Sequence, residues 1–257
     1  MVVVVVLLVA GVLSLPSGPV GSSPTFDAAQ GPANSAAHGV SGGPWHAVIA
    51  LGLATTMGVS VPVGDLGGEY AALGCNVSYP SGSLSSIFVP PTGANATVGG
   101  AAAWIFDYAN ASGFLFVAVL NGRATPLFSA YGGQCSFLTL ARPLSDYSPL
   151  VDSSVAVSAA NAAGGTQFLH NYSGVDRIWI LSGDPLTDQA TWGVTYTTCS
   201  PSLSTGSTTG YFFNATVNAA TGHVNAHSVA TESCSSIGMN TLRPSSTGFA
   251  SPTLPRD

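Results

Sequence analysis

The chain has 257 residues, of which 46% are hydrophobic and only 6% charged, and its formal net charge is −6. This apolar content can supply a core, which excludes a disordered protein. The basic residues are all arginines and lie far apart in the sequence, so the clustered positive charge that nucleic-acid binding needs is missing. Two explanations of the scarce charge stay open. One is a coding bias toward Ala, Gly and Val, and the other is adaptation to acid, where each lysine would add self-repulsion.

The first 22 residues are expected to direct export. The stretch "MVVVVVLLVAGVLSLPSG" is an apolar run that ends at Ser14, Pro16 and Gly18. The run is too short to span a bilayer comfortably and fits the core of a signal peptide, although no basic residue precedes it. We prefer export over a buried strand or helix. Residues 1–22 are therefore expected to be a signal peptide or a short N-terminal anchor, and the protein to be extracellular or at the cell surface.

Cysteines and glycosylation signals agree with export. Four cysteines favour disulfides in an oxidising compartment. Of the three possible pairings we prefer Cys75 with Cys135 and Cys199 with Cys234, because each bridge then stays within one half of the chain. No two cysteines have the spacing of a CxxC redox or zinc motif, and we expect no metal and no cofactor. Five Asn-x-Ser/Thr sequons are glycosylation candidates, although a chain rich in Ser and Thr carries some by chance. They are Asn76, Asn95, Asn110, Asn171 and Asn214.

The chain after residue 150 has the order of one helix followed by an antiparallel meander. Residues 152–154, Asp-Ser-Ser, are N-cap candidates for a helix over roughly 153–170, with a possible break at the Gly-Gly pair 164–165. The segments that follow are rich in aromatic and β-branched residues and are bounded by turn formers, which is typical of strands. These segments are 177–183, 191–199 and the hairpin within 210–228.

The first half repeats this order more faintly. A short helix, broken by glycine and proline, is expected in "FDAAQGPANSAAHGVSGGPW", followed by several strands and Cys135. Both halves contain a Trp-x-x-x-Tyr strand, at 104–108 and at 192–196, then an aromatic-rich strand, an Asn-containing turn and a cysteine. We therefore predict an internal duplication, while any two β-hairpins also look alike. The expected divisions are 1–22, a first α+β half at 23–145, a second half at 146–240 and a polar tail at 241–257.

The hairpin "GYFFNATVNAATGHVNAHS" at 210–228 raises the question of a metal site. Strand alternation puts Tyr211 and Phe213 on the core face and Phe212 and Asn214 toward solvent. It puts His223 and His227 together on the polar face of the returning strand. Histidines four residues apart on a strand are separated by roughly 13 Å. One zinc ion, which binds nitrogen at about 2.0–2.1 Å, cannot bridge them. We therefore expect a solvated polar face.

The segment "FNATVNAATGHV" resembles the end of the PepSY domain, in which a strand runs into a turn of the type Val-Asp-Ala-x-Thr-Gly-x-Val. The matching residues are Val217, Asn218, Ala219, Thr221, Gly222 and Val224, with Asn218 in place of the usual Asp. The resemblance covers about a hundred residues of the chain. It implies a small α+β module of exported proteins and peptidase propeptides that binds or restrains protein partners. The scarce charges also resemble those of exported proteins of acid-living archaea.

Two sequence patterns typical of hydrolases are present, but both are weak evidence for catalysis. "GVSGG" at 39–43 matches G-x-S-x-G, and Ser41 with Asp152 and His170 or His223 would complete a serine-hydrolase order. A nucleophile elbow must lie between a buried strand and a helix, which the surrounding sequence does not predict. Carboxylate pairs could come from Asp65 with Glu69, or from Asp107 with Asp152, but no spacing singles them out.

We expect an α+β protein of two related halves, each a helix packed on an antiparallel meander, that binds an extracellular protein or a cell-surface component without catalysis. The resemblance implies restraint of peptidases as one form of this role. A secreted acid-stable hydrolase and a subunit of an extracellular filament are the alternatives. Nucleic acid is not expected as a partner, and a membrane only through a retained N-terminal segment.

Overall fold

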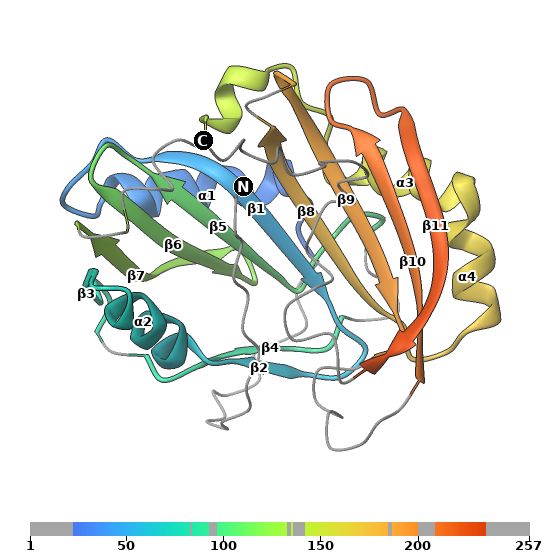
Figure 1. Ribbon diagram of the computed structural model, residues 1–257, viewed down its shortest axis with the longest axis horizontal. Coiled ribbons are helices and arrows are strands. Elements are labelled where there is room, and N and C mark those ends of the chain that lie inside the picture. The colour runs from blue at the N-terminus through green and yellow to red at the C-terminus, as the bar shows by residue number, and fades with distance from the viewer. Residues whose placement is uncertain are drawn as a thin grey trace, which may run out of the picture.

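The fold is α+β and is built on one antiparallel sheet of nine strands (Figure 1). The structure, a computed structural model, describes residues 23–82, 84–92, 97–132, 135, 142–184, 187–199 and 209–234. The strand order is β11-β10-β9-β8-β1-β5-β6-β7-β3, and β2 pairs with β4 in a second small sheet. The strands are β1 (His46–Ala54), β2 (Val59–Val61), β3 (Asn76–Ser78), β4 (Ile87–Val89), β5 (Ala103–Ala109), β6 (Gly113–Leu120), β7 (Arg123–Tyr131), β8 (Asp176–Asp184), β9 (Gln189–Thr197), β10 (Thr209–Asn218) and β11 (Val224–Ser233).

The middle of the sheet joins two meanders. Strands β5 to β7 and strands β8 to β11 each pair in chain order, and β1 pairs with β5 on one side and with β8 on the other. Gly52 in β1 lies opposite Trp104 and Trp179. A Cβ atom at Gly52 would lie 2.9 Å from the Trp104 ring, so only glycine lets both indoles pack across the central strand.

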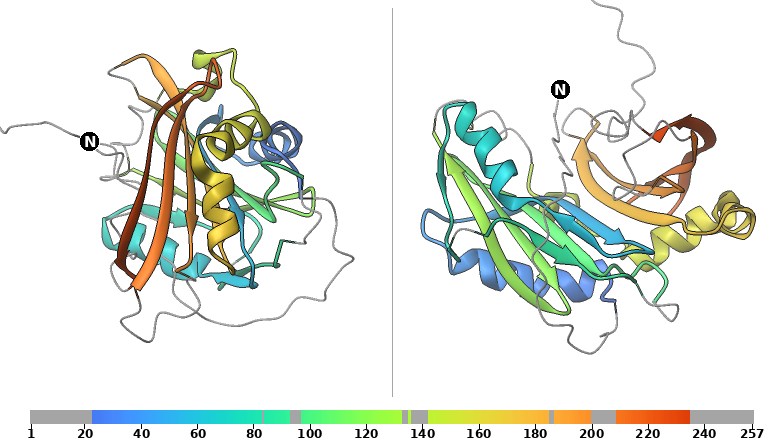
Figure 2. Two further views of the ribbon diagram at one scale, coloured as in Figure 1. Left: turned by 90° about the vertical axis from the view of Figure 1, so that its right-hand side faces the viewer. Right: turned by 90° about the horizontal axis from the view of Figure 1, so that it is seen from below.

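Most of the helices cover one face of the sheet, which we call the helical face (Figure 2). The described helices are α1 (Phe26–His38), α2 (Val63–Ala72), the 3-10 turn η2 (Leu144–Tyr147), α3 (Ser153–Ala160), the π-helical segment η3 (Asn161–Gly165) and α4 (Thr166–Asn171). Helices α1, α3 and α4 pack on the helical face over a core that contains Trp104, Trp179 and Trp192, none more than 1% exposed. These three tryptophans are thus core residues.

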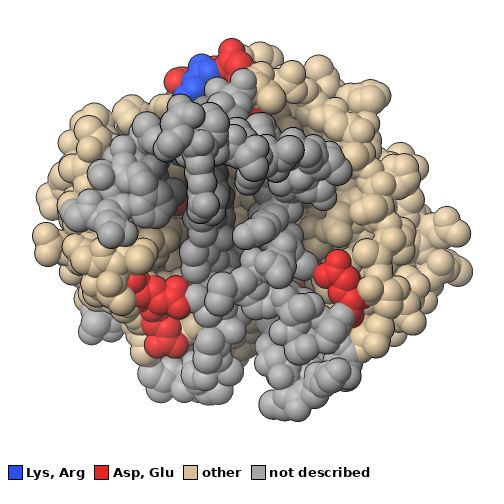
Figure 3. Space-filling view, viewed as in Figure 1, with Lys and Arg blue, Asp and Glu red and all other residues tan. Residues whose placement is uncertain are grey.

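The opposite face differs between the two meanders. Helix α2 and the β2–β4 pair cover it over β5 to β7, where Tyr70, Phe114 and Phe128 are buried. Over β8 to β10 the same face presents mainly short uncharged side chains, among them Thr195 and Thr216. Among the described residues, Figure 3 shows few charged side chains on this view of the molecule.

Two helices depart from the sequence expectation. Helix α1 runs unbroken through Pro32, because Phe26, Ala29 and Ala33 pack their apolar stripe on the sheet. Helix α2 was not expected, since Gly67 and Gly68 are weak helix formers. Tyr79 leaves no space for a Cβ at Gly67, so close packing and not helix propensity decides the residue there. The helical segment after residue 152 agrees with the prediction, including the break, where Gly164 has a φ of 132°.

Helix α1 is tied to the sheet by two aromatic side chains of β5. Trp104 donates from Nε1 to the carbonyl of Pro24 over 2.8 Å, and Tyr108 donates from Oη to Oδ1 of Asn34 over 2.8 Å. Both rings are buried, and burial raises the pKa of Tyr108 well above its ordinary value. These bonds satisfy the polar atoms of the buried aromatics and fix the helix along the strand.

The segment α3–η3 is tied to β9 in the same way. Trp192 donates from Nε1 to the carbonyl of Val151 over 3.0 Å, and Tyr196 donates from Oη to Oδ1 of Asn161 over 2.6 Å. Burial raises the pKa of Tyr196, as it raises that of Tyr108. Asn161 lies on the helix where the π-helical segment begins.

The N-termini of α1 and α3 meet and share their caps. The backbone N–H groups of Phe26 and Asp27 donate to Ser153 Oγ over 2.9 Å and to Asp152 Oδ1 over 3.0 Å. Asp152 also accepts from the Ser154 N–H over 3.3 Å, whereas Thr25, the N-cap of α1, makes no capping bond with its own side chain. Partial burial alone would raise the pKa of Asp152, but these hydrogen bonds outweigh it and lower the pKa.

Candidate functional site

The candidate binding site is the outer edge of β11. Among the described strands, β11 ends the sheet at one side, paired only with β10. At the other side β7 is covered by β3, with Asn76 opposite Tyr131 and Ser78 opposite Ser129. In an antiparallel pair about half of a strand's N–H and C=O groups point away from its partner, so β11 presents a row of backbone donors and acceptors that no described strand pairs with.

Strand β11 is long and is held at both ends. It runs from Val224 to Ser233, and its side chains from 225 to 229 are exposed. Asn218 closes the turn before it, because its Oδ1 accepts from the N–H groups of Ala220 and Thr221, each over 3.0 Å. The Cys199–Cys234 disulfide fixes the far end. The strand contains no lysine or proline, the residues that commonly block edge pairing.

The histidines of this hairpin do not share a face, which corrects the alternation argument. The pairing register shifts between Thr216 and Val217, so Val224 lies opposite Val217 but Ala226 lies opposite Thr216. The extra residue turns His227 to the face of Ala215, the helical face, where its ring centroid lies 6.5 Å from that of Phe213. Simple alternation fails here because a β-bulge inserts one residue into the strand. Within the described residues no group of three His, Cys, Asp or Glu side chains could hold a metal.

The other strand of the hairpin follows the expected alternation in part. Phe213, Ala215 and Val217 are buried on the helical face. Phe212, expected on the solvent side, is only 2% exposed, and Asn214 is half-buried with Oδ1 accepting from Thr195 Oγ1 over 2.8 Å. Tyr211, expected in the core, is 39% exposed and stacks on Tyr172.

The serine-hydrolase residues do not come together. Ser41 lies in an exposed turn after α1, beside β7, where its carbonyl accepts from Tyr131 Oη. His223 lies in the β10–β11 turn at the other side of the sheet, and His170 lies on α4. Asp152 serves as the shared helix cap. No strand runs into a helix at Ser41, so the elbow that would expose a nucleophile is missing from this part of the described chain.

The two carboxylate pairs differ in geometry. Asp65 and Glu69 lie four residues apart on α2 and are neighbours on one face of that helix. Asp107 points to the opposite face from Phe106 and Tyr108, whereas Asp152 lies on the helical side. Asp107 is 8% exposed, its Oδ1 has no hydrogen-bond partner, and burial raises its pKa to about 8. Asp107 and Asp152 therefore do not form the carboxylate pair that glycosidase-type chemistry needs.

The glycosylation candidates differ in accessibility. Asn76 and Asn171 are exposed. Asn110 is half-buried and uses its amide in the β5–β6 turn, where Nδ2 donates to the Gly42 carbonyl over 2.6 Å and Oδ1 accepts from the Gly113 N–H over 3.0 Å. Asn95 lies outside the described residues, as do the expected signal segment 1–22 and the expected tail 241–257.

Two disulfides join the cysteines in the pairs that the sequence argument prefers. Cys75 pairs with Cys135 at a Cα–Cα distance of 5.8 Å, and Cys199 pairs with Cys234 at 5.5 Å. They fit an oxidising environment. None of the helices in the described ranges is long and apolar enough to cross a bilayer. Comparison with protein-family models, with curated proteins and with solved structures finds no match.

Proposed function

We propose that the chain is an exported binding protein of the extracellular space or cell surface that acts without bond chemistry. Its partner is a protein that adds an extended segment to the free edge of β11. The observation that carries this proposal is a ten-residue edge strand with exposed side chains, no lysine and no proline. Main-chain hydrogen bonds supply affinity in such strand addition, and alternate side chains supply specificity.

The first meander supports this mode of binding. There β3, which lies between β1 and β5 in the sequence, pairs with residues 129–131 of β7, the counterpart of β11 in chain order, and covers that part of its edge. A partner segment on β11 would repeat that arrangement between two molecules. Small side chains at Ala226 and Ser228 flank the edge on one face, and Glu232 is the only charged residue of the strand. The partner segment is therefore expected to be largely uncharged, with a basic residue near Glu232.

The proposal includes two related halves of PepSY type. The support is a matched pair of hydrogen-bond sets. The Trp-x-x-x-Tyr of β5 bonds to residues 24 and 34, and that of β9 bonds to residues 151 and 161. In each half the two acceptors are separated by the same interval, since 34 − 24 and 161 − 151 both equal 10. Two unrelated hairpins have no reason to share both donors and both acceptors at equal spacing.

The partner class follows from this resemblance, because PepSY modules of propeptides restrain peptidases. We propose that the chain restrains a secreted peptidase. The two disulfides support an oxidising compartment, and the exposed Asn76 and Asn171 are the sequons best placed for sugar.

The test adds a charge to the proposed edge. Val229 is 64% exposed on β11, so Val229→Lys leaves the fold intact but blocks edge pairing. Thr216→Lys places the same charge on exposed Thr216 of the neighbouring strand β10 and is the matched control. Peptidase activity in the host's extracellular fluid is measured on labelled casein with increasing amounts of each protein. We expect the wild type and Thr216→Lys to inhibit the peptidase. Inhibition by Val229→Lys should be weaker by about tenfold or more, which corresponds to a loss of ~1.4 kcal/mol in binding free energy.

Two results would contradict the proposal. Equal inhibition by both variants would move the binding site away from β11. Cleavage of casein by the purified protein alone would favour the hydrolase alternative. Amide exchange supplies a second readout, because the backbone of β11 becomes protected when a partner strand is added.

A further inference from the structure

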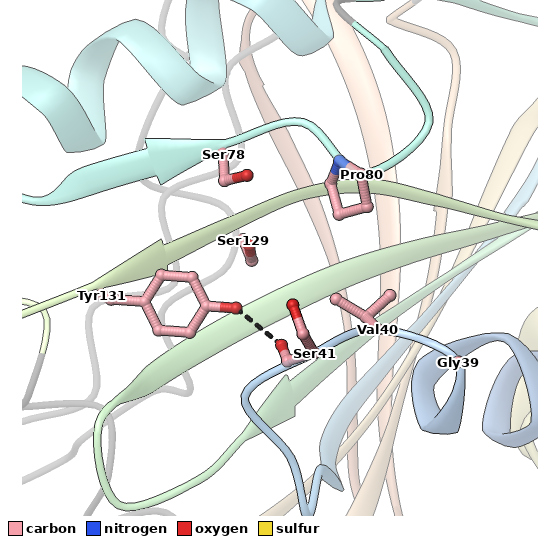
Figure 4. Close-up of a pocket in the computed structure, with 7 residues that line it drawn as sticks. All are labelled: Gly39, Val40, Ser41, Ser78, Pro80, Ser129 and Tyr131. Atoms are coloured by element: carbon pink, nitrogen blue, oxygen red, sulfur yellow. Dashed lines mark hydrogen bonds between the residues drawn. The ribbon is translucent and has the colours of Figure 1, made fainter.

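A recess lined by hydroxyl groups lies at the β7 side of the sheet, far from β11 (Figure 4). It lies between the turn after α1, strand β7 and the end of β3, and its volume is about 300 Å³. We call it the serine recess. Its hydroxyls come from Ser41, Ser78, Ser129 and Tyr131, and Val40 and Pro80 add carbon surface.

The serine recess contains a buried polar atom without a partner. Ser129 is 1% exposed, and its Oγ makes no hydrogen bond. Its side chain lies between Ser78 and Tyr131 in the recess (Figure 4). Leaving a buried hydroxyl unpaired costs about 1–3 kcal/mol, so a group that enters the recess and bonds to Ser129 recovers this free energy.

The outer wall of the recess is held in place before any ligand arrives. Three successive carbonyls, those of residues 40–42, each accept a hydrogen bond from a side chain, one in the same loop and two in distant parts of the chain. The donors are Trp45 Nε1 over 3.2 Å, Tyr131 Oη over 3.0 Å and Asn110 Nδ2 over 2.6 Å. A loop fixed in this way loses little conformational entropy on binding.

The lining chemistry selects an uncharged ligand. No Asp, Glu, Lys, Arg or His is among the lining residues, so a charged ligand would lose hydration without gaining a counter-charge. Serine hydroxyls both donate and accept, as sugar hydroxyls do. The carbon atoms of Val40 and Pro80 and the Tyr131 ring suit the apolar C–H groups of a sugar ring. The volume is at the lower end of the range of about 300–1,000 Å³ for ligand sites, which fits one ring.

We infer that the serine recess binds one uncharged saccharide or polyol unit. The unit can be a free or cell-surface saccharide. It can also be a glycan on Asn76, which precedes Ser78 by two residues and shares its side of β3. This second source rests on the proposed export. The inference is otherwise independent of β11.

The test uses full-length protein made without glycosylation. Methyl α-glucoside, methyl α-mannoside and myo-inositol are titrated to millimolar concentrations while amide shifts are followed by NMR. We expect shifts confined to residues 39–42, 78–80 and 129–131 for at least one probe. Ser129→Ala should weaken binding ~5-fold through one lost hydrogen bond, whereas Ser158→Ala, on the exposed side of α3, leaves it unchanged. Ser41→Phe should fill the recess and abolish binding at unchanged Tm.

Stability separates this role from a structural one. Ser129→Ala removes an unpaired buried hydroxyl, so the free protein should be as stable as wild type or more stable. A fall in Tm would overturn the inference, because it would mean that the hydroxyl has a structural partner. Absence of shifts at the recess with all probes, or equal binding by Ser41→Phe, would do the same.

The two sources are then distinguished with protein from a glycosylating host. If only Asn76→Gln binds the probe, the Asn76 glycan occupies the recess in the wild type. If both proteins bind equally, the recess serves a separate saccharide. Both results support the inference and differ only in where the saccharide comes from.

Discussion

Asp107 is a buried acid, and its ionisation should affect the stability of the fold. Burial raises the pKa of Asp107 to about 8 from an ordinary value of 3.8. The pKa of Tyr70 is also raised, first by burial, then by the negative charge of Asp107 and least by that of Glu69. Between these two pKa values of Asp107 the folded state binds more protons than the unfolded state. Stability contributed by neutral Asp107 is thus fully present below pH 3.8 and is lost as pH rises toward 8.

We predict that Asp107→Asn flattens the pH dependence of stability. Asparagine keeps the shape of the neutral acid but cannot ionise, so the wild type should lose more Tm than the variant between pH 4 and pH 8. Thermal unfolding at a series of pH values measures this difference. Asp27 and Asp176 also have raised pKa values and leave a residual slope in both proteins. Parallel curves would mean that Asp107 ionises freely in the folded state.

Sequence alone locates Asp107 in a strand but not its burial. Its strand "AWIFDYA" has apolar or aromatic side chains on both faces, so alternation does not distinguish core from surface. His227 shows the reverse problem. Polar and apolar residues alternate along its strand, but the bulge after Val224 moves His227 to the other face. No local residue pattern predicts the bulge.

The helix pair α1 and α3 depends on one carboxylate at the element scale. Asp152 caps α3 through Ser154 and caps α1 through Asp27. We predict that Asp152→Ala lowers the free energy of unfolding by about 1–2 kcal/mol, since it removes one N-cap and one bond across the helices. Thr25→Ala is the matched control, because Thr25 is the N-cap of α1 but makes no side-chain capping bond, and it should change stability by less than ~0.5 kcal/mol.

Urea unfolding measures both variants, and pH supplies a further check. The pKa of Asp152 is lowered in the folded state, so its contribution is present above its ordinary value of 3.8 and disappears as pH falls through the folded value. The deficit of Asp152→Ala should therefore shrink in strong acid. A larger loss in Thr25→Ala than in Asp152→Ala would refute the shared cap.

Elements with strong local signals follow from the sequence, and those decided by tertiary contacts do not. The cap at 152–154 and the Gly-Gly pair at 164–165 identify the helical segment and its break. Helix α2 is not predicted, because Gly67 is a weak helix former whose role is to leave space for Tyr79. This is a tertiary contact that the local sequence does not show. The free edge of β11 is likewise invisible, since edges depend on the order of strands in the sheet. The serine recess is missed for the same reason, because its serines come from three separate segments.

At the scale of the whole molecule, the matched aromatic anchors bear on how the two halves arose. Tyr108 on β5 and Tyr196 on β9 each tie a helix to one of the two meanders through one Asn side chain. Strands β5 and β9 are separated by β1 and β8, so the two hydroxyls are roughly 14 Å or more apart and should act independently. A duplicated unit would carry the same interaction twice.

We predict that Tyr108→Phe and Tyr196→Phe each destabilise the protein by about 1 kcal/mol, and that the double variant loses the sum. Each change deletes only a hydroxyl from a buried ring and leaves an asparagine oxygen without its donor. Tyr211→Phe, at the 39% exposed Tyr211 of β10, is the control and should be neutral. Chemical denaturation of the four variants measures these values. Equal and additive losses fit two copies of one helix-and-meander unit, because equivalent bonds in equivalent environments have equal energies. A loss confined to one tyrosine would mean that the shared spacing has no shared energetic role, and the argument for duplication would lose its main physical support.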